Sequence, residues 1–293
     1  MQVNQIFRVR NFGRAVAVEV GALEDSFLDR GRSLGAARVL NAVGIGYQNL
    51  SDLRAFLKLD TGLLSRFLRS LESEGLVETT PNPNDLRSRI ARLTSAGKAE
   101  FDTYERLSNE RASAILERHK NAKRLLEAMD IVTIALSRES IVFEEVDYAS
   151  EIATQCLSAF ARELSERLNL EFDLKKSGDP DLSQMKHPHG TFIVARLGNM
   201  PIGCVGVKGS GGNQAEIKRM WIAPVARGLG LARRLMIAAE ESARDLGIDT
   251  LRLDTNSTLF EAVSLYRKMG WAEIDRFNDD PYPDLFFEKR LVR

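Results

Sequence analysis

Apolar residues recur at helical spacing through most of the first 140 positions. In the opening segment they repeat every three or four residues, which predicts one long amphipathic helix over residues 3–27. Ser33 is a suitable N-cap for a following helix, and Gly75 is suited to end a later one. The same periodicity predicts three shorter helices, over residues 34–43, 50–57 and 61–74.

A change from helical to alternating spacing follows these helices. Residues 76–80 and 89–93 are short alternating runs on either side of a segment rich in Pro, Asn and Asp, which predicts a β-hairpin. Thr94 is expected to cap a further helical stretch that continues to about Ser137. The first 140 residues therefore predict a mainly helical domain that carries one hairpin.

Beyond residue 140 strands and helices alternate, which is typical of an α/β unit. A charged loop with Pro and Gly is expected over residues 173–190. The change in pattern indicates two domains, 1–140 and 141–293, and an α+β fold class overall. The second domain is predicted to contain strands at 141–146, 191–197, 202–207, 215–222 and 250–254, helices at 151–168, 228–246 and 259–269, and two final strands.

Composition narrows the function classes only a little. The 293 residues include 41 basic and 41 acidic side chains, so net charge indicates neither a nucleic-acid nor a membrane partner. No apolar run has membrane-spanning length and no signal-peptide pattern opens the chain, so we expect a cytoplasmic protein without a membrane partner. Cys156 and Cys204 lack metal-ligand spacing, and we expect both to be buried thiols.

A glycine-bearing turn between a strand and a helix carries the clearest chemistry. Gly228 and Gly230 lie where a helix is predicted to begin, so backbone N–H groups can approach an anion without obstruction from Cβ atoms. Such a turn suits a pyrophosphate, but on its own it fits dinucleotides and nucleotides as well.

Two sequence blocks resemble the GNAT family of acetyltransferases. Arg227, Gly230 and Ala232 match the spacing of that family's pyrophosphate loop. The later segment from Asn256 to the run 265–271, Leu-Tyr-Arg-Lys-Met-Gly-Trp, resembles its second block. The resemblance covers residues 141–293 and implies a GNAT α/β fold with a mixed central sheet, acetyl-CoA as cosubstrate and no metal.

The resemblance also implies roles for individual positions. The backbone of Met220, Trp221 and Ile222 would hold the pantetheine arm or polarise the thioester carbonyl, and Asn256 and Tyr266 would contact the cofactor further along. The pyrophosphate would rest on the loop formed by Arg227, Gly228, Leu229, Gly230, Leu231 and Ala232.

Acetyl transfer to an amine needs a base and an acid. An ammonium must lose a proton before it attacks a thioester, and Glu216 is our candidate base, directly or through water; binding substrate or facing solvent are equally good interpretations. Tyr266 is the candidate acid for the departing thiolate, with a core position on its helix as the alternative. His187 and His189 lack a third metal ligand nearby and are expected to be loop residues.

The hairpin and the helix before it resemble MarR-type winged helix-turn-helix regulators. The resemblance rests on Asp85, Arg87 and the Leu-Thr pair after Arg92, and on the run 71–77; it covers residues 1–140. It implies binding of double-stranded DNA by a homodimer formed through this domain. A protein-interaction domain that does not touch DNA is the alternative. The candidate DNA-binding residues are Thr61, Ser65, Arg66 and Arg69 on the recognition helix, with Arg87 and Arg89 on the wing.

Three functions from different classes fit both halves together. The first is an N-acetyltransferase acting on a small amine, with an amino-acid-like acceptor favoured, fused to a DNA-binding regulator. The second is a regulator whose GNAT-like half only senses acetyl-CoA or a metabolite. The third is a protein-lysine acetyltransferase. An unbroken loop beside Glu216, Asn256 and Tyr266 favours catalysis.

Overall fold

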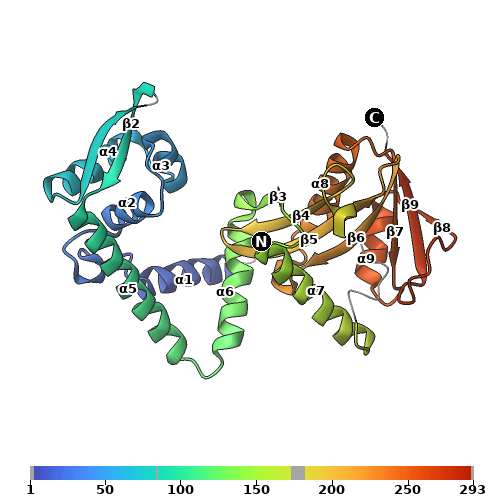
Figure 1. Cartoon of the computed structure of the whole chain (residues 1–293). Helices are drawn as coiled ribbons and strands as arrows, with labels where there is room; N and C mark the ends of the chain where they lie inside the picture. Colours follow the sequence, from blue (N-terminus) through green and yellow to red (C-terminus); the bar gives the residue numbers. More distant parts are fainter. Residues whose placement is uncertain (1–2, 84, 173–181, 292–293) are drawn as a thin grey trace. The chain divides into compact units, whose positions relative to one another are not determined.

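The computed structural model describes residues 3–83, 85–172 and 182–291 (Figure 1). The chain forms two compact units, Met1–Ala122 and Lys123–Arg293. Within the described ranges, no helix is both long enough and apolar enough to cross a membrane. Asn84 of the expected hairpin loop and residues 173–181 of the expected charged loop lie outside the described residues.

The first unit is helical with one antiparallel hairpin, as the hydrophobic pattern predicts. Leu40 and Leu53 are fully buried in its core together with Leu71. Its elements are α1 (Val3–Glu19), η1 (Phe27–Asp29), α2 (Leu34–Gly44), α3 (Leu50–Leu57), α4 (Thr61–Ser73), β1 (Val77–Asn82), β2 (Asp85–Leu93) and α5 (Ser95–Glu117).

Side-chain caps fix where these helices begin. The predicted N-caps Ser33 and Thr94 accept hydrogen bonds from the backbone N–H groups of Ala36 and Gly97, and Asp60 caps α4 in the same way. Each cap satisfies one of the amides that a helix start leaves without a partner. The sequence therefore locates the starts of α2, α4 and α5 correctly.

Two helix predictions need correction. Helix α1 ends at Glu19 and does not reach residue 27, because Gly21 adopts a left-handed φ of 70°. The stretch after Thr94 is two helices, α5 and α6 (Ala122–Leu136), since the polar run 118–121 has no apolar side chain to hold the helix against a core. The two compact units divide between Ala122 and Lys123, and Ile134 of α6 is buried in the core of the second unit.

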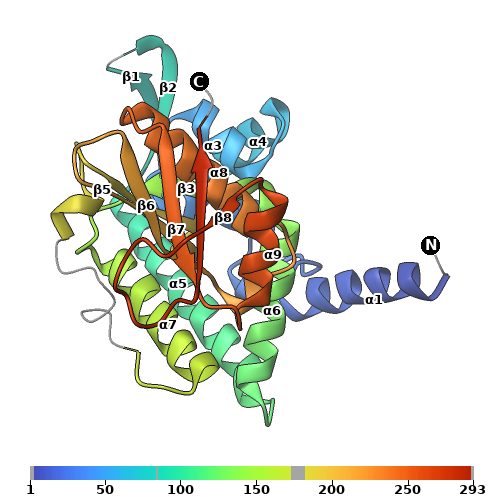
Figure 2. The same ribbon diagram turned by 90° about the vertical axis from the view of Figure 1, so that its right-hand side faces the viewer.

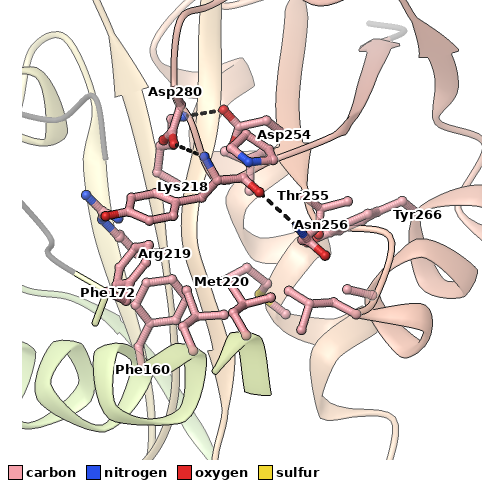
Figure 3. Close-up of a pocket in the computed structure, with 17 residues that line it drawn as sticks. Phe160, Phe172, Lys218, Arg219, Met220, Asp254, Thr255, Asn256, Tyr266 and Asp280 are labelled. Carbon is pink, nitrogen blue, oxygen red and sulfur yellow. Dashed lines mark hydrogen bonds and ion pairs between the residues drawn. The ribbon is translucent and has the colours of Figure 1, made fainter. Parts of the chain in front are cut away.

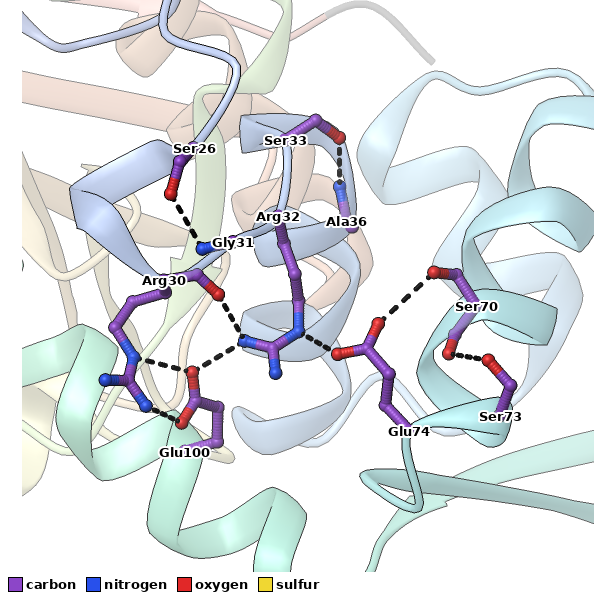
Figure 4. A network of polar contacts seen from close by, with 10 residues as sticks. All are labelled: Ser26, Arg30, Gly31, Arg32, Ser33, Ala36, Ser70, Ser73, Glu74 and Glu100. Carbon is purple, nitrogen blue, oxygen red and sulfur yellow. Dashed lines mark hydrogen bonds and ion pairs between the residues drawn. The ribbon is translucent and has the colours of Figure 1, made fainter.

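A charged network joins three segments of the first unit (Figure 4). Glu100 of α5 accepts hydrogen bonds from Arg30 at 2.6 Å and from Arg32 at 2.7 Å. Arg32 also bonds Glu74, the C-cap of α4, at 2.5 Å. The hydrogen bond from Arg30, with that from Arg32, lowers the pKa of Glu100, so this largely buried carboxylate is ionised at neutral pH. The network fixes the end of α4 against α5.

A mixed seven-stranded sheet forms the second unit (Figure 2). Its strand order is β3-β4-β5-β6-β7-β9-β8, and every neighbouring pair is antiparallel except β6 with β7. The strands are β3 (Val142–Glu145), β4 (Thr191–Leu197), β5 (Met200–Gly209), β6 (Gln214–Ile222), β7 (Thr250–Thr255), β8 (Ala272–Ile274) and β9 (Leu285–Arg290).

Helices cover both faces of this sheet (Figure 1). Alternate residues of β4 separate the two faces: Phe192 packs in the cluster beneath α7, and Ile193 packs in the one that contains α8. The sheet's core is thus divided into two apolar layers. The helical elements are α6, η2 (Arg138–Ser140), α7 (Glu151–Leu168), η3 (Leu182–Met185), η4 (Pro224–Ala226), α8 (Leu231–Asp245) and α9 (Phe260–Lys268).

Candidate functional site

Strands β6 and β7 pair over only part of their lengths. The parallel pairing ends at Ile217 and Leu253, while β6 continues to Ile222. The N–H group of Ala223 donates to a β5 carbonyl at 2.9 Å, and successive amides of a strand point in opposite directions. The N–H groups of Ile222 and Met220 therefore face the opening between β6 and β7, where an extended ligand can add to β6 as a strand.

A cavity of about 410 Å³ lies along this opening. Residues of β6, α7 and α9 line it together with the loop 226–233. Gly228 and Gly230 have φ values of 75° and 73°, which only glycine adopts readily, and α8 begins at Leu231. The first amides of a helix have no intrahelical acceptor and carry partial positive charge. This end of the cavity therefore fits a pyrophosphate.

Arg227 is fixed at the edge of the same cavity. Its guanidinium donates to the carbonyl of Ile222 at 3.1 Å and to Glu163 of α7 at 2.5 Å. Glu163 also accepts from the indole N–H of Trp221 at 2.9 Å, and it forms a longer ion pair with Arg167. Glu163 thus links α7 to the end of β6 and to the glycine-bearing loop.

A second, smaller cavity of about 120 Å³ adjoins the first (Figure 3). Met220, Leu259, Ala262 and Tyr266 line both cavities. The charged residues Lys218, Arg219, Asp254 and Asp280 line the small cavity and not the large one. Two ligands, one bound in each cavity, would therefore contact each other beside these shared residues.

An ion-pair cluster occupies one side of the small cavity. Lys218 is buried, and its ammonium lies 2.7 Å from Asp254 and 3.2 Å from Glu216. Asn278 donates to the same Asp254 oxygen at 2.6 Å. Glu216, the predicted base, lines neither cavity, because its carboxylate is directed to Lys218.

Asp280 is a buried carboxylate that the sequence does not single out. It lies in the connection between β8 and β9 and accepts from the backbone N–H of Tyr282 at 3.0 Å. Burial raises its pKa, and the negative charge of Asp254 raises it further; Lys218 and Arg219 act in the opposite direction. A carboxylate with a raised pKa takes a proton more readily than an ordinary aspartate does.

Tyr266 lies on α9 at the wall shared by the two cavities. Burial, with a smaller effect from Asp254, raises the pKa of its phenol well above the usual value, so the hydroxyl is protonated at neutral pH. Asn256, which lines the small cavity, donates to the carbonyl of Tyr282 at 2.9 Å and accepts from Thr258 at 3.0 Å. Its amide thus joins the end of β7 to the connection that carries Asp280.

The predicted DNA-binding residues lie on the surface of the first unit. Arg66 and Arg69 of α4 are exposed, and so are Arg87 and Arg89 of β2. Two of these arginines also bond backbone carbonyls: Arg69 bonds the carbonyl of Ser65, and Arg89 bonds that of Thr79. Thr61 is exposed and accepts from Arg54, and Ser65 is half-buried, while Leu64, Leu68 and Leu71 form the buried side of α4.

Sequence comparison assigns the second unit to a known protein family. Residues 152–271 match the sequence model of the Acetyltransferase (GNAT) family. The chain is 38% identical over 116 residues to the IAA acetyltransferase of Azospirillum brasilense, covering 38% of this chain and 74% of that protein. The chain belongs to the GNAT acetyltransferase family. It is an N-acetyltransferase, and acetyl-CoA is the acetyl donor in this family.

The first unit is similar to a different protein family. Residues 45–88 match the model of the MarR family, so a MarR-type winged helix-turn-helix precedes the GNAT domain. Over 83 residues the chain is 31% identical to the multiple antibiotic resistance protein MarR of Escherichia coli K12, covering 28% of this chain and 54% of that protein.

A solved GNAT acetyltransferase from Staphylococcus aureus Mu50 aligns with 52% of this chain and 99% of its own, at 21% identity and a TM-score of 0.45.

The structure brings together most of the GNAT residues that the sequence singles out. Met220, Trp221, Ile222 and the loop 227–232 surround the large cavity, except for Leu229, which packs at the edge of the core. Tyr266 joins that cavity to the small one, whereas His187 lines neither and contacts Glu145 at 2.8 Å. Sequence reasoning misses Glu163, Arg219 and Asp280, because no local motif marks residues that only the folded sheet brings together.

Proposed function

We propose that this GNAT domain transfers the acetyl group of acetyl-CoA to a small, amino-acid-like amine. The observation that carries the proposal is the pair of adjoining cavities, one ending at an anion-binding loop and the other lined by opposite charges. Acetyl-CoA supplies an acetyl group activated as a thioester. The backbone of Met220, Trp221 and Ile222 would hold its pantetheine arm, and Arg227–Ala232 its pyrophosphate.

Tyr266 is proposed as the acid of the reaction. Tyr266 lines both cavities and its hydroxyl is protonated, so we propose that it gives its proton to the sulfur as the thiol leaves. Asn256 would support the cofactor indirectly, since its amide already bonds the Tyr282 carbonyl. Glu216 is the base that we predict from the sequence. From its position beside Lys218, it would need a water molecule to reach the acceptor amine.

Thiol release tests the proposed transfer. Purified protein is mixed with acetyl-CoA and a panel of amines that includes L- and D-amino acids and a lysine-containing peptide, and free thiol is followed. Release above hydrolysis with small amines supports the proposal. Tight acetyl-CoA binding without release from any amine would identify a sensor, and release with the peptide alone would identify a protein-lysine acetyltransferase.

We also propose that residues 1–140 bind double-stranded DNA as a homodimer, with residues 141–293 as the acetyltransferase domain. Exposed arginines on α4 and on β2 support DNA contact by the recognition helix and the wing. Dimerisation is supported by α1, where Ile6, Phe7 and Phe12 are between 43% and 56% exposed. A surface this apolar on a soluble unit suits burial against a second copy.

Arg66→Ala is expected to weaken binding to the operator by about 10-fold to 100-fold, because one arginine contact to a base edge contributes ~1–3 kcal/mol. The measurement is a fluorescence-anisotropy titration with duplex DNA from the promoter of the protein's own gene, repeated at several salt concentrations. The matched control is Arg106→Ala on α5, where an exposed arginine pairs with Glu110. Equal losses in both variants would contradict a specific contact by Arg66.

A further inference from the structure

The large cavity carries more positive than negative side chains. Among the residues that the structure describes, three arginines and two glutamates line it: Arg167, Arg227, Arg233, Glu163 and Glu261. Arg227 pairs with Glu163 at 2.5 Å. Arg167 pairs with Glu261 at 2.8 Å and with Glu163 at the longer distance of 3.5 Å. Two arginines thus take up both glutamates, and the positive charge of Arg233 remains.

Arg233 lies in the first turn of α8, directly after the glycine-bearing loop. Its side chain is exposed, and it has no ion pair or hydrogen bond with any residue in the ranges 3–83, 85–172 and 182–291. The first amides of a helix carry partial positive charge, so a cation beside them is unfavourable until an anion binds there. An anionic ligand therefore accounts for an arginine at this position, whereas the stability of the helix does not.

The order of the groups in acetyl-CoA indicates which anion reaches Arg233. Its thioester would lie beside Met220 and Tyr266, which also line the small cavity, and its pantetheine arm would follow β6 to the pyrophosphate at the loop. Beyond the pyrophosphate comes the ribose, which carries the 3′-phosphate. The backbone amides of the loop are the proposed partners of the pyrophosphate, so the 3′-phosphate is the anion left for a side chain.

A guanidinium is well suited to this phosphate, because its paired N–H groups match two phosphate oxygens. A second exposed arginine, Arg138 of η2, lies near the loop: a Cβ atom at Gly230 would be 3.4 Å from its guanidinium. Arg138 does not line the large cavity, whereas Arg233 does. Arg233 is therefore the better placed of the two for a ligand that occupies this cavity.

We propose that Arg233 binds the 3′-phosphate of acetyl-CoA and makes the domain selective for CoA over its 3′-dephosphorylated form. This inference rests on the proposed position of the donor along β6 and the loop. No bond forms or breaks at the 3′-phosphate during acetyl transfer, so Arg233 contributes to the affinity for the donor. The residue thus determines which form of the cofactor the domain binds.

Binding calorimetry with two matched ligands tests the role of Arg233 without turnover. CoA and 3′-dephospho-CoA, which differ only in the phosphate, are each titrated into the native protein and into Arg233→Gln. The native protein is expected to bind CoA more tightly. Arg233→Gln should weaken CoA binding about 10-fold, the lower end for a hydrogen bond between charged groups because the side chain is exposed, and should leave 3′-dephospho-CoA binding unchanged. The native preference should also shrink as salt is added.

Arg234→Gln is the matched control, since it removes the next arginine of the same helix. Arg234 donates to the carbonyl of Arg138 at 3.3 Å, lies over the Phe143 ring at 4.8 Å and lines neither cavity, so this variant should keep the native preference. Arg233→Lys should recover part of the preference, because it restores the charge without the paired donors. The thermal unfolding midpoint of ligand-free Arg233→Gln should not fall, since a cation at a helix start does not stabilise it.

Three results would contradict the assignment. Equal affinity of the native protein for the two ligands would show that the 3′-phosphate has no partner in the protein. An equal loss for both ligands in Arg233→Gln would mean that Arg233 acts on the pyrophosphate or on the loop. Loss of the preference in Arg138→Gln but not in Arg233→Gln would assign the phosphate to Arg138. Each result leaves the proposed acetyl transfer standing, because that proposal fails separately, when no amine gives thiol release.

Discussion

Tyr266→Phe is expected to lower kcat about 100-fold, the lower end of the range for a positioned proton donor. The substitution removes only the hydroxyl of a residue that lines both cavities, and it keeps the ring that packs against Trp271 and Phe287. Acetyl-CoA affinity should change little, because the anion-binding loop lies elsewhere in the large cavity. Steady-state kinetics and calorimetry with acetyl-CoA measure the two effects separately.

The raised pKa of Tyr266 adds a condition to this prediction. The phenol stays protonated to a higher pH than an ordinary tyrosine, whose pKa is about 10. Loss of this proton should therefore not reduce kcat at any pH below about 10. Tyr148→Phe is the matched control, as Tyr148 packs against Phe192 and lines neither cavity. A Tyr266→Phe variant with native kcat would remove the acid role from this residue.

Gly97→Ala should destabilise the winged unit by about 3 kcal/mol, the upper end of the range for overpacking. A Cβ atom at this position would lie 1.8 Å from the carbonyl oxygen of Leu76. That carbonyl cannot move away freely, because it accepts from the N–H of Thr94 at 3.1 Å, and the Thr94 side chain bonds the carbonyl of Gly75. The start of α5 and the beginning of the wing are therefore packed backbone against backbone.

Thermal unfolding followed by circular dichroism measures this effect, and DNA binding should be lost with the folded unit. Gly13→Ala is the control, because a Cβ atom there meets nothing within 4 Å and alanine favours a helix. Acetyl-CoA-dependent thiol release should survive Gly97→Ala, since the two compact units have separate cores. Loss of both activities in a folded variant would show that the units do not work independently.

Local chemistry explains why much of the fold follows from the sequence. Ser33 and Thr94 cap helices through their own side chains, and Gly228 with Gly230 supplies backbone conformations that other residues adopt poorly. Features of this kind are encoded within a few residues. The long helix expected after Thr94 is instead two helices: the polar run 118–121 separates α5, whose Tyr104 packs in the core of the first unit, from α6, whose Ile134 packs in the core of the second.

The two cavities depend on contacts that no local pattern records. Glu163, Arg219 and Asp280 come from α7, β6 and the β8–β9 connection, which only the strand order brings together. The left-handed φ of Arg219 and the shift in the β5–β6 register beside it cannot be recognised in the sequence of β6. For the same reason Glu216 is an attractive base in the sequence, although its carboxylate lies beside Lys218.

The wall shared by the two cavities has a consequence for the kinetic scheme. Met220 and Tyr266 border both spaces, so a donor in one and an acceptor in the other can be present at once and react across a single contact. Neither Cys156 nor Cys204 is accessible to carry an acyl group, as both thiols are fully buried. We therefore expect a ternary complex, in which case double-reciprocal plots at several fixed acceptor concentrations should intersect instead of running parallel.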